Sequence, residues 1–470
     1  MSSPKVSVII PSYNGADFIG EAIRSVLDQT YQNFELIIVD DASQDHTPDV
    51  IGQFDDPRIK YLAHEVNQGP DAARRLAIGV SSGDILAFLD QDDLFHPEKL
   101  QAHVTLLESS PEIGFTYNSR FELNHSASTI REIWRPPQKV TLADLILGFP
   151  ISPSDMVVRR EWSKYLDLTK EPPLIHGGEY VITGRLFMSG CRFASIDRAL
   201  NYRRYHSGRT FSKLSARCEA ELSAQQRVFS DPRCPAEVLA LRDTAFMNTY
   251  RIWAYYALAQ GDTAIGQEYI RKAVELKPSL VAGNPSELVN FLMTESIADE
   301  SVDHGALLKS IFDQLPPELS HLSNQYGWAV GRGYLLRGAR AVMWGRPDAG
   351  REHFQQAARW EARIDEAFLR LQAYHLMNYE TEFGAEATQA VLQSLAAHLE
   401  KIGNRSDVRW LKGCYSANQA FSHYQAGEYV TVPGRVIRAI VNDPQYLLNR
   451  GMLSILVRSA VGRWVGYAHG

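Results

Sequence analysis

The sequence predicts an α/β region with a mainly parallel sheet, followed by an all-helical region. Two observations support this prediction. Through about the first 120 residues, short apolar runs alternate with segments of helical periodicity, which is the pattern of βαβ units. After residue 215, strand signals become rare, and alanine, leucine, glutamine, arginine and glutamate recur at helical spacing. We therefore predict two domains, over residues 1–215 and 216–470.

Four short apolar runs predict the strands of the sheet, and two amphipathic segments predict helices between them. The run at residues 6–10 is continuously apolar and ends at Pro11, as expected for a strand buried on both faces. The other predicted strands cover residues 36–39, 59–62 and 85–89, and the helices cover residues 18–27 and 71–80. Six prolines interrupt residues 120–176, so this stretch predicts loops and short elements.

Composition and charge indicate a folded protein and argue against nucleic-acid binding. The chain has 470 residues, of which 45% are hydrophobic and 22% are charged, as in folded proteins with a large core. Its formal net charge of −7 provides no general basic field that would hold nucleic acid by its phosphates. We therefore expect no nucleic-acid partner.

Cysteine usage and hydropathy predict a cytoplasmic location. The cysteines are too far apart for a CxxC zinc motif and too few for a disulfide framework, so we expect reduced thiols. They are Cys191, Cys218, Cys234 and Cys414. The first apolar run is too short for the core of a signal peptide, and no run of 18 apolar residues occurs.

Polar side chains follow three of the predicted strands. In open parallel sheets, ligands bind beyond the carboxyl ends of the strands, so these residues are candidates for a binding site. They are Ser12, Tyr13 and Asn14, then Asp40 and Asp41, and then Asp90, Asp92 and Asp93.

The carboxylates in Asp90-x-Asp92-Asp93 predict a site for Mg²⁺ or Mn²⁺, which prefer hard oxygen ligands and bridge to substrate phosphates. An isolated motif of this kind is more often an acidic turn that caps the following helix. Here two further features favour a nucleotide and metal site. They are a second acidic pair, Asp40-Asp41, and a loop that is followed by the guanidinium of Arg74.

At this point the sequence resembles the inverting family-two glycosyltransferases of the GT-A fold. The similarity covers residues 4–210 and is carried by three ordered motifs. These motifs are VSVIIPSYNGADFIGEAIRSVLDQTYQNFELIIVDDAS, NQGPDAARRLAIGVSSGDILAFLDQDD and GEYVITGRLFMSGCRFASIDRALNYRRYHSG. The resemblance implies metal-dependent, inverting transfer of a sugar from a nucleotide-sugar donor to a hydroxyl acceptor, with Mn²⁺ or Mg²⁺ as cofactor.

The resemblance also implies roles for individual residues. The nucleotide base would be held by Pro11, Tyr13 and Asp41, with Asp41 accepting a hydrogen bond from a ring N–H. Asp90 would lie near the ribose and the metal, Asp92 would ligate the metal, and Arg74 matches an arginine of the donor site. Arg75 departs from the asparagine that the family usually has there, which would alter the donor pocket.

The position of the catalytic base depends on the alignment register. Family members usually carry Glu-Asp-Tyr before a helix with Arg-Leu and a later glycine, and an ungapped match places Gly178-Glu179-Tyr180 on this triplet. Glu179 then replaces the aspartate, whereas an alternative register puts Tyr180 at the base position. We prefer Glu179 because a carboxylate can deprotonate a hydroxyl near neutral pH. The competing interpretation is a carboxylate that only complements the helix dipole.

His206 matches a histidine that follows Tyr-Arg in the family and is a predicted metal ligand. Its basic neighbours would help to neutralise the departing diphosphate. The alternative is a histidine that is simply packed or exposed.

The helical half contains a degenerate repeat. Segments that begin at Gly261, Gly345 and Gly427 each carry an alanine twelve residues later. These are the turn and contact residues of tetratricopeptide-like hairpins, although the copies lie 84 and 82 residues apart rather than about 34. We expect other helical hairpins between them.

Residues 430–470 contain five arginines and a single acidic residue, Asp443, interleaved with apolar residues. One interpretation is peripheral contact with the inner face of an anionic membrane. We prefer a helical element that packs on the repeats and exposes its arginines to solvent.

Two other functions compete with the glycosyltransferase interpretation. In the first, the N-terminal half is a catalytically weak nucleotide-sugar-binding scaffold, and the helical repeats bind a protein partner or a second copy of the chain. The second is a nucleotidyltransferase, but the segment from Pro11 to Gly15 does not resemble a glycine-rich phosphate loop. The resemblance favours a UDP-sugar donor. The acceptor stays open between a protein, a lipid-linked glycan and a polysaccharide.

Overall fold

The computed structural model describes residues 3–124, 129–148, 150–166, 177–205 and 214–467, which form two compact units. The first unit comprises residues 1–130 and 134–324, and the second comprises residues 131–133 and 325–470. The four cysteines are free, as expected for reduced thiols, and all four are buried.

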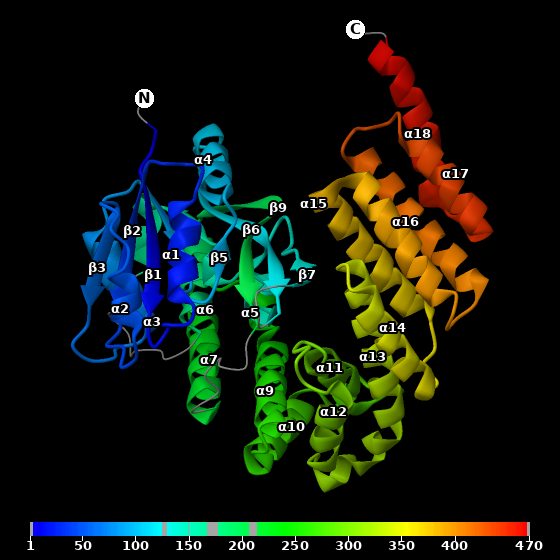
Figure 1. Ribbon diagram of the computed structural model, residues 1–470, viewed down its shortest axis with the longest axis horizontal. Coiled ribbons are helices and arrows are strands. Elements are labelled where there is room, and N and C mark those ends of the chain that lie inside the picture. Colours follow the sequence, from blue (N-terminus) through cyan, green and yellow to red (C-terminus); the bar gives the residue numbers. More distant parts are fainter. Residues whose placement is uncertain (1–2, 125–128, 149, 167–176, 206–213, 468–470) are drawn as a thin grey trace. The chain divides into compact units, whose positions relative to one another are not determined.

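The central strands of the first unit are parallel (Figure 1). Strand β1 (Val6–Ser12) lies between β2 (Phe34–Asp40) and β4 (Ile85–Phe88), and β3 (Ile59–Ala63) pairs with β2. All four predicted strands are therefore confirmed. Every residue of β1 and β2 is buried, which explains why their sequences are almost continuously apolar.

The rest of the sheet is mixed. Strand β8 (Val157–Arg159) runs antiparallel to both β4 and β6 (Ile113–Leu123). Strand β9 (Arg192–Arg204) is parallel to β6, and β5 (Leu94–Phe95) is antiparallel to β9. The eleven-residue strand β6 enters the stretch where loops and short elements were predicted.

Helices cover both faces of this sheet. One face packs against α1 (Ile19–Leu27) and α4 (Lys99–Ser109), and the other packs against α3 (Pro70–Val80) and α6 (Gly178–Met188). In α1 the buried residues recur at intervals of three and four, so one apolar side faces the strands. Shorter elements of this region are α2 (Thr47–Ile51), β7 (Ile130–Trp134), α5 (Leu142–Gly148), η1 (Pro153–Asp155) and η2 (Arg160–Tyr165).

Helices follow β9 to the end of the described chain, as predicted. Those before residue 325 are α7 (Leu214–Phe229), α8 (Ala236–Leu239), α9 (Arg242–Ala259), α10 (Thr263–Leu276), η3 (Pro278–Val281), α11 (Glu287–Ser296) and α12 (His304–Asp313). Next come η4 (Pro317–Gln325), α13 (Tyr326–Met343), α14 (Pro347–Arg359), α15 (Glu366–Leu399), α16 (Arg405–Gln425), α17 (Val432–Asn442), η5 (Pro444–Leu448) and α18 (Arg450–Tyr467). In the described part of the chain, no helix has the length and apolar character needed to cross a membrane.

The predicted repeat corresponds to three helical hairpins. Gly261, Gly345 and Gly427 have φ angles of 84°, 74° and 78° and lie in the turns before α10, α14 and α17. This left-handed backbone conformation explains the glycine at each turn. The alanines twelve residues later, Ala273, Ala357 and Ala439, are at most 1% exposed.

Candidate active site

The loop that follows β4 places the Asp90–Asp93 carboxylates at the carboxyl edge of the sheet. Ser154 of η1 holds both ends of this loop: the Asp90 backbone N–H donates to Ser154 Oγ at 3.1 Å, and Ser154 Oγ donates to Asp93 Oδ2 at 2.6 Å. Asp93 is 1% exposed, whereas the side chain of Asp90 is 32% exposed and Asp92 is half-buried. Asp93 therefore anchors the loop, whereas Asp90 and Asp92 are partly exposed.

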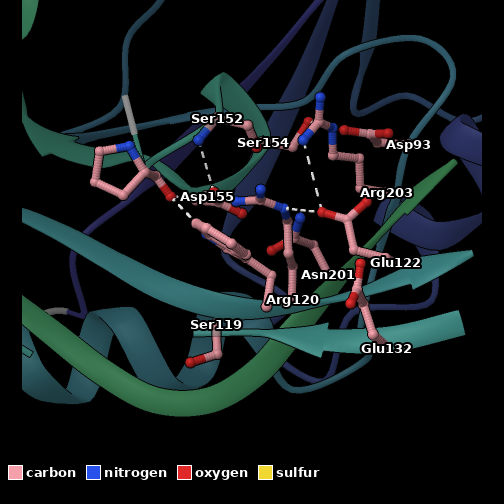
Figure 2. Close-up of polar contacts among 12 residues, drawn as sticks. Asp93, Ser119, Arg120, Glu122, Glu132, Ser152, Ser154, Asp155, Asn201 and Arg203 are labelled. Carbon is pink, nitrogen blue, oxygen red and sulfur yellow. Dashed lines mark hydrogen bonds and ion pairs between the residues drawn. The ribbon is translucent and has the colours of Figure 1, made fainter. Parts of the chain in front are cut away.

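A buried network of charges supports this loop (Figure 2). Arg120 donates to Glu122 Oε1 at 2.8 Å and to Asp155 Oδ2 at 2.7 Å, and Arg203 lies 3.6 Å from Glu122 Oε1. Burial lowers the pKa of Arg203, but the negative charges of Glu122, Asp93 and Asp155 outweigh it and raise the pKa overall. The ion pairs compensate charges that would otherwise be buried without partners.

Arg74 of α3 connects carboxylates from three different elements. Its guanidinium lies 3.0 Å from Asp71 Oδ1, 2.9 Å from Asp90 Oδ1 and 3.7 Å from Glu179 Oε1. Burial lowers the pKa of Arg74, but the charges of these three acids raise it above the usual value. The structure thus brings the predicted donor-site residues Arg74 and Asp90 and the predicted base Glu179 into one site.

The beginning of α6 has an unusual backbone arrangement. Gly177 adopts a left-handed conformation with φ 80°, and a Cβ atom on Gly178 would lie 2.2 Å from Asp71 Oδ2. Only glycine at position 178 therefore leaves room for the Asp71 carboxylate. Asp71 was not among the predicted site residues, although two signals pointed to it: a glycine in place of the family's glutamate and an acid in the first turn of α3.

Tyr180, the alternative base, points toward the helices that follow. Its hydroxyl donates to Glu221 Oε1 at 3.1 Å, and Trp253 Nε1 donates to Glu221 Oε2 at 2.8 Å. Burial and the neighbouring Glu221 raise the pKa of Tyr180 well above its usual value. This geometry favours Glu179 over Tyr180 as the base.

At the end of β1, the predicted nucleotide residues are joined to the Asp90–Asp93 loop by Gln91, which was not among the predicted site residues. Pro11 is buried in β1, and the Tyr13 side chain is 44% exposed. Gln91 Oε1 accepts from the Tyr13 backbone N–H at 2.9 Å, and Gln91 Nε2 donates to the Tyr13 carbonyl oxygen at 3.0 Å. A Cβ on Gly15 would lie 2.2 Å from Gln91, so this contact requires glycine there.

Asp41 is 2% exposed and holds the loop that precedes α3. Its carboxylate accepts from the backbone N–H groups of Gln68 and Gly69 at 2.9 and 2.7 Å and lies 2.6 Å from His64 Nδ1. Asp41 therefore orders the segment from which Arg74 extends, and its contact with a nucleotide base stays a prediction. His206 lies outside the described residues.

A cavity of about 590 Å³, including its opening to solvent, adjoins the Arg74 cluster. Asp71, Arg74, Arg75 and Glu179 form its polar part. The rest of the wall is apolar and includes Phe88, Phe115, Met156, Val158 and Ile182. Arg75, the residue that departs from the family pattern, thus lines a pocket beside the predicted base.

Comparison with known proteins identifies the family. Residues 7–166 match the model described as "Glycosyl transferase family 2". Over 177 residues, the chain is 33% identical to the Escherichia coli protein named "UDP-Glc:alpha-D-GlcNAc-diphosphoundecaprenol beta-1,3-glucosyltransferase WfgD", and the match covers 38% of this chain and 67% of that protein. The chain belongs to glycosyl transferase family 2.

The family 2 match is confined to the N-terminal part of the chain. An uncharacterized glycosyltransferase of Rickettsia conorii is 40% identical over 134 residues, which are 28% of this chain and only 22% of that relative. The structure of S. aureus TarS 1-349 in complex with UDP-GlcNAc aligns with 77% of this chain and 93% of that chain, at 19% identity and a TM-score of 0.39. Glu179 and His206 lie beyond the segment that matches the family 2 model.

Proposed function

We propose that this family 2 member is a metal-dependent, inverting glycosyltransferase that transfers a sugar from a nucleotide-sugar donor to a hydroxyl acceptor. The observation that carries the proposal is the position of Arg74 between Asp90 and Glu179, at 2.9 and 3.7 Å. A donor-site cation, a carboxylate predicted to lie near the ribose and the metal, and a candidate base then lie in one cluster. This is the juxtaposition that transfer from a nucleotide sugar to a hydroxyl requires.

The site suits Mn²⁺ or Mg²⁺. Asp90 and Asp92 offer two partly exposed carboxylates, which are hard oxygen ligands. Among the described residues, no three His, Cys, Asp or Glu side chains gather into a metal-binding group. A cation that takes one or two carboxylates and completes its coordination with water and substrate oxygens fits such a donor set. When bound, it would neutralise charge on the departing nucleoside diphosphate.

Side chains of this chain carry out or support the remaining steps of the proposed reaction. Glu179, whose side chain is 25% exposed, accepts the proton of the acceptor hydroxyl. The hydroxyl oxygen then attacks the anomeric carbon on the face opposite the leaving diphosphate, which inverts the configuration. Arg74 keeps Asp90 and Glu179 apart and oriented, and Pro11, Tyr13 and Asp41 belong to the nucleotide end of the site.

The names of two relatives indicate which donor and which class of acceptor to propose. WfgD and WfaP of Escherichia coli are both named for transfer from UDP-Glc to alpha-D-GlcNAc-diphosphoundecaprenol. The chain is 33% and 28% identical to them over 177 and 223 residues. We therefore include in the proposal a UDP-sugar donor and a lipid-linked glycan as acceptor.

Thermal unfolding with a panel of UDP- and GDP-sugars, each with Mn²⁺ or with excess chelator, tests the proposal. A donor at 100 times its dissociation constant should add about 2.7 kcal/mol to the free energy of unfolding. We expect stabilisation by a UDP-sugar that needs Mn²⁺ and is lost in Asp92→Asn. Equal stabilisation in chelator would overturn the metal-dependent proposal, and donor binding without any hydrolysis or transfer would favour the scaffold function.

A further inference from the structure

The hairpin of α17, η5 and α18 exposes a group of aliphatic side chains. Of the 18 large apolar residues that are exposed in the described chain, six lie in this short segment. We call them the α17–α18 apolar surface: Ile437, Val441, Leu447, Leu448, Leu453 and Val457. Leu448 is 85% exposed and Val457 is 63% exposed, so the hairpin itself covers little of them.

These residues are additional to the hairpin's own core. Val432, Val436 and Ala439 of α17 pack with Met452 and Ile455 of α18 in one buried cluster. Helix α17 therefore has a buried apolar side and further apolar residues outside it. A helix packed on one side normally presents polar residues on the other.

Exposed arginines accompany the apolar surface. Arg438, Arg450 and Arg458 are all exposed. Residues 430–459 contain four arginines and one acidic residue, a net charge of +3 in a chain whose overall charge is −7. The one acid, Asp443, accepts from the Gln445 backbone N–H at 3.0 Å as a helix cap.

We propose that the α17–α18 apolar surface binds peripherally to an anionic lipid bilayer. Aliphatic side chains enter the boundary between headgroups and acyl chains, and the exposed arginines of the same hairpin meet lipid phosphates. Because no described helix is long and apolar enough to cross the bilayer, the contact is at the interface.

Charge and composition favour this occupant over two others. A second copy of the chain would bring the same net charge of +3 against itself, which is repulsive. Protein interfaces concentrate much of their binding energy in large aromatic anchors, whereas the apolar residues of the α17–α18 apolar surface are only valine, leucine and isoleucine. An anionic bilayer complements both the charge and the aliphatic character.

Vesicle flotation with the full chain tests the proposal without any assay of transfer. Vesicles contain phosphatidylcholine alone or phosphatidylcholine and phosphatidylglycerol in equal parts. We expect binding only to the anionic vesicles and weaker binding as salt is raised. Leu447→Ser with Leu448→Ser, and Arg450→Glu with Arg458→Glu, should each reduce binding, the second pair by about fivefold or more per arginine.

Matched controls are exposed residues of the same unit outside the surface. Leu371→Ser on α15 and Arg405→Glu at the start of α16 should leave vesicle binding unchanged, and circular dichroism should show native helicity in all variants. Equal binding to neutral vesicles, equal losses in the controls, or no vesicle binding at all would overturn the proposal. A dimer that dissociates in the Leu447→Ser, Leu448→Ser variant would assign the surface to a second copy.

Discussion

Arg74 lies at the centre of the candidate site because one guanidinium contacts acids from three elements. Asp71 lies on the same helix, Asp90 follows β4 and Glu179 begins α6. The Arg74 side chain is only 12% exposed, so little water screens these contacts. The position of the donor-site residue Asp90 relative to the proposed base Glu179 therefore depends on Arg74 and its partners.

Glu179→Gln tests the assignment of the base. The amide keeps the size of the side chain and cannot accept the proton, so turnover should fall by at least about 10²-fold while donor binding is retained. Tyr180→Phe is the matched variant in the neighbouring residue. It should leave turnover within a few-fold and lower the melting temperature, because it removes the hydrogen bond to Glu221. Steady-state rates and thermal unfolding measure both effects, and the opposite pattern would place the base at Tyr180.

A double-mutant cycle tests the steric relation between Asp71 and Gly178. Asp71→Ala removes one partner of Arg74, and Gly178→Glu introduces a Cβ that would lie 2.2 Å from Asp71 Oδ2. Each single variant should lose turnover and stability. The pair Asp71→Ala, Gly178→Glu should recover much of the loss, because the new carboxylate can use the vacated space.

The pair Asp71→Ala, Gly178→Ala is the control, since it relieves the collision without restoring a carboxylate. We expect a coupling free energy of about 1 kcal/mol or more from rates and from unfolding. Additive effects, or equal recovery in the control pair, would show that Asp71 has no positioning role.

At the scale of elements, α4 and β6 enclose a polar cluster beneath the sheet. Lys99 and His103 of α4 both contact Asn118 Oδ1 of β6, and all three residues are fully buried. Burial lowers the pKa of Lys99 to about 7, and the charge of Asp155 offsets only part of this effect. The packing of α4 therefore places a group that titrates near neutral pH inside the core.

Lys99→Met should change how stability depends on pH. Between pH 7 and about 10, lysine is protonated in the unfolded chain but largely neutral in the folded chain, so stability rises with pH. Below pH 7 the cost of the buried charge is fully present. Above pH 7, the free energy of unfolding of the wild type, measured relative to that of Lys99→Met, should therefore increase by at most about 1.4 kcal/mol per pH unit. Denaturant titrations across this range measure the difference, and parallel profiles would contradict the prediction.

At the scale of the molecule, the sheet domain and the first helices after it share a core. Tyr180 of α6 is tied through Glu221 of α7 to Trp253 of α9. Leu142 and Ile146 of α5 pack in one buried cluster that also contains Val228. The first compact unit accordingly extends to residue 324, well beyond the end of β9 at Arg204.

We therefore expect a fragment of residues 1–324 to fold and to bind the donor with Mn²⁺. A fragment of residues 1–215, the predicted first domain, should aggregate or melt at a lower temperature, because it lacks Glu221, Val228 and Trp253. Thermal unfolding with and without UDP compares the two fragments. Cooperative unfolding of the shorter fragment with an unchanged response to UDP would support the predicted boundary instead.

Long-range contacts explain which site residues the sequence missed. Asp90, Asp92 and Glu179 stand in local motifs, so they could be selected as candidates from the sequence. Ser154 is separated from Asp90 by 64 residues, and Gln91 is separated from Ser12 by 79. Nothing in the local pattern distinguishes Ser154 from an ordinary loop residue, and the acidic motif around Gln91 does not show that Gln91 reaches β1, because both roles come from the pairing of β1, β4 and β8.

The sequence by itself determined the family resemblance, the four parallel strands and the helical second half, and it made the acidic loop and Glu179 candidates, since each depends on local periodicity or on adjacent residues. The tertiary structure decided that Arg74 meets Asp71, Asp90 and Glu179 together, that Tyr180 turns toward Glu221, and that the hairpin of α17 and α18 leaves the α17–α18 apolar surface exposed among the described residues. The physical reason is that burial and charge pairing depend on segments far apart in the chain. Periodicity predicts which side of a helix is apolar, but only packing determines whether another element covers it.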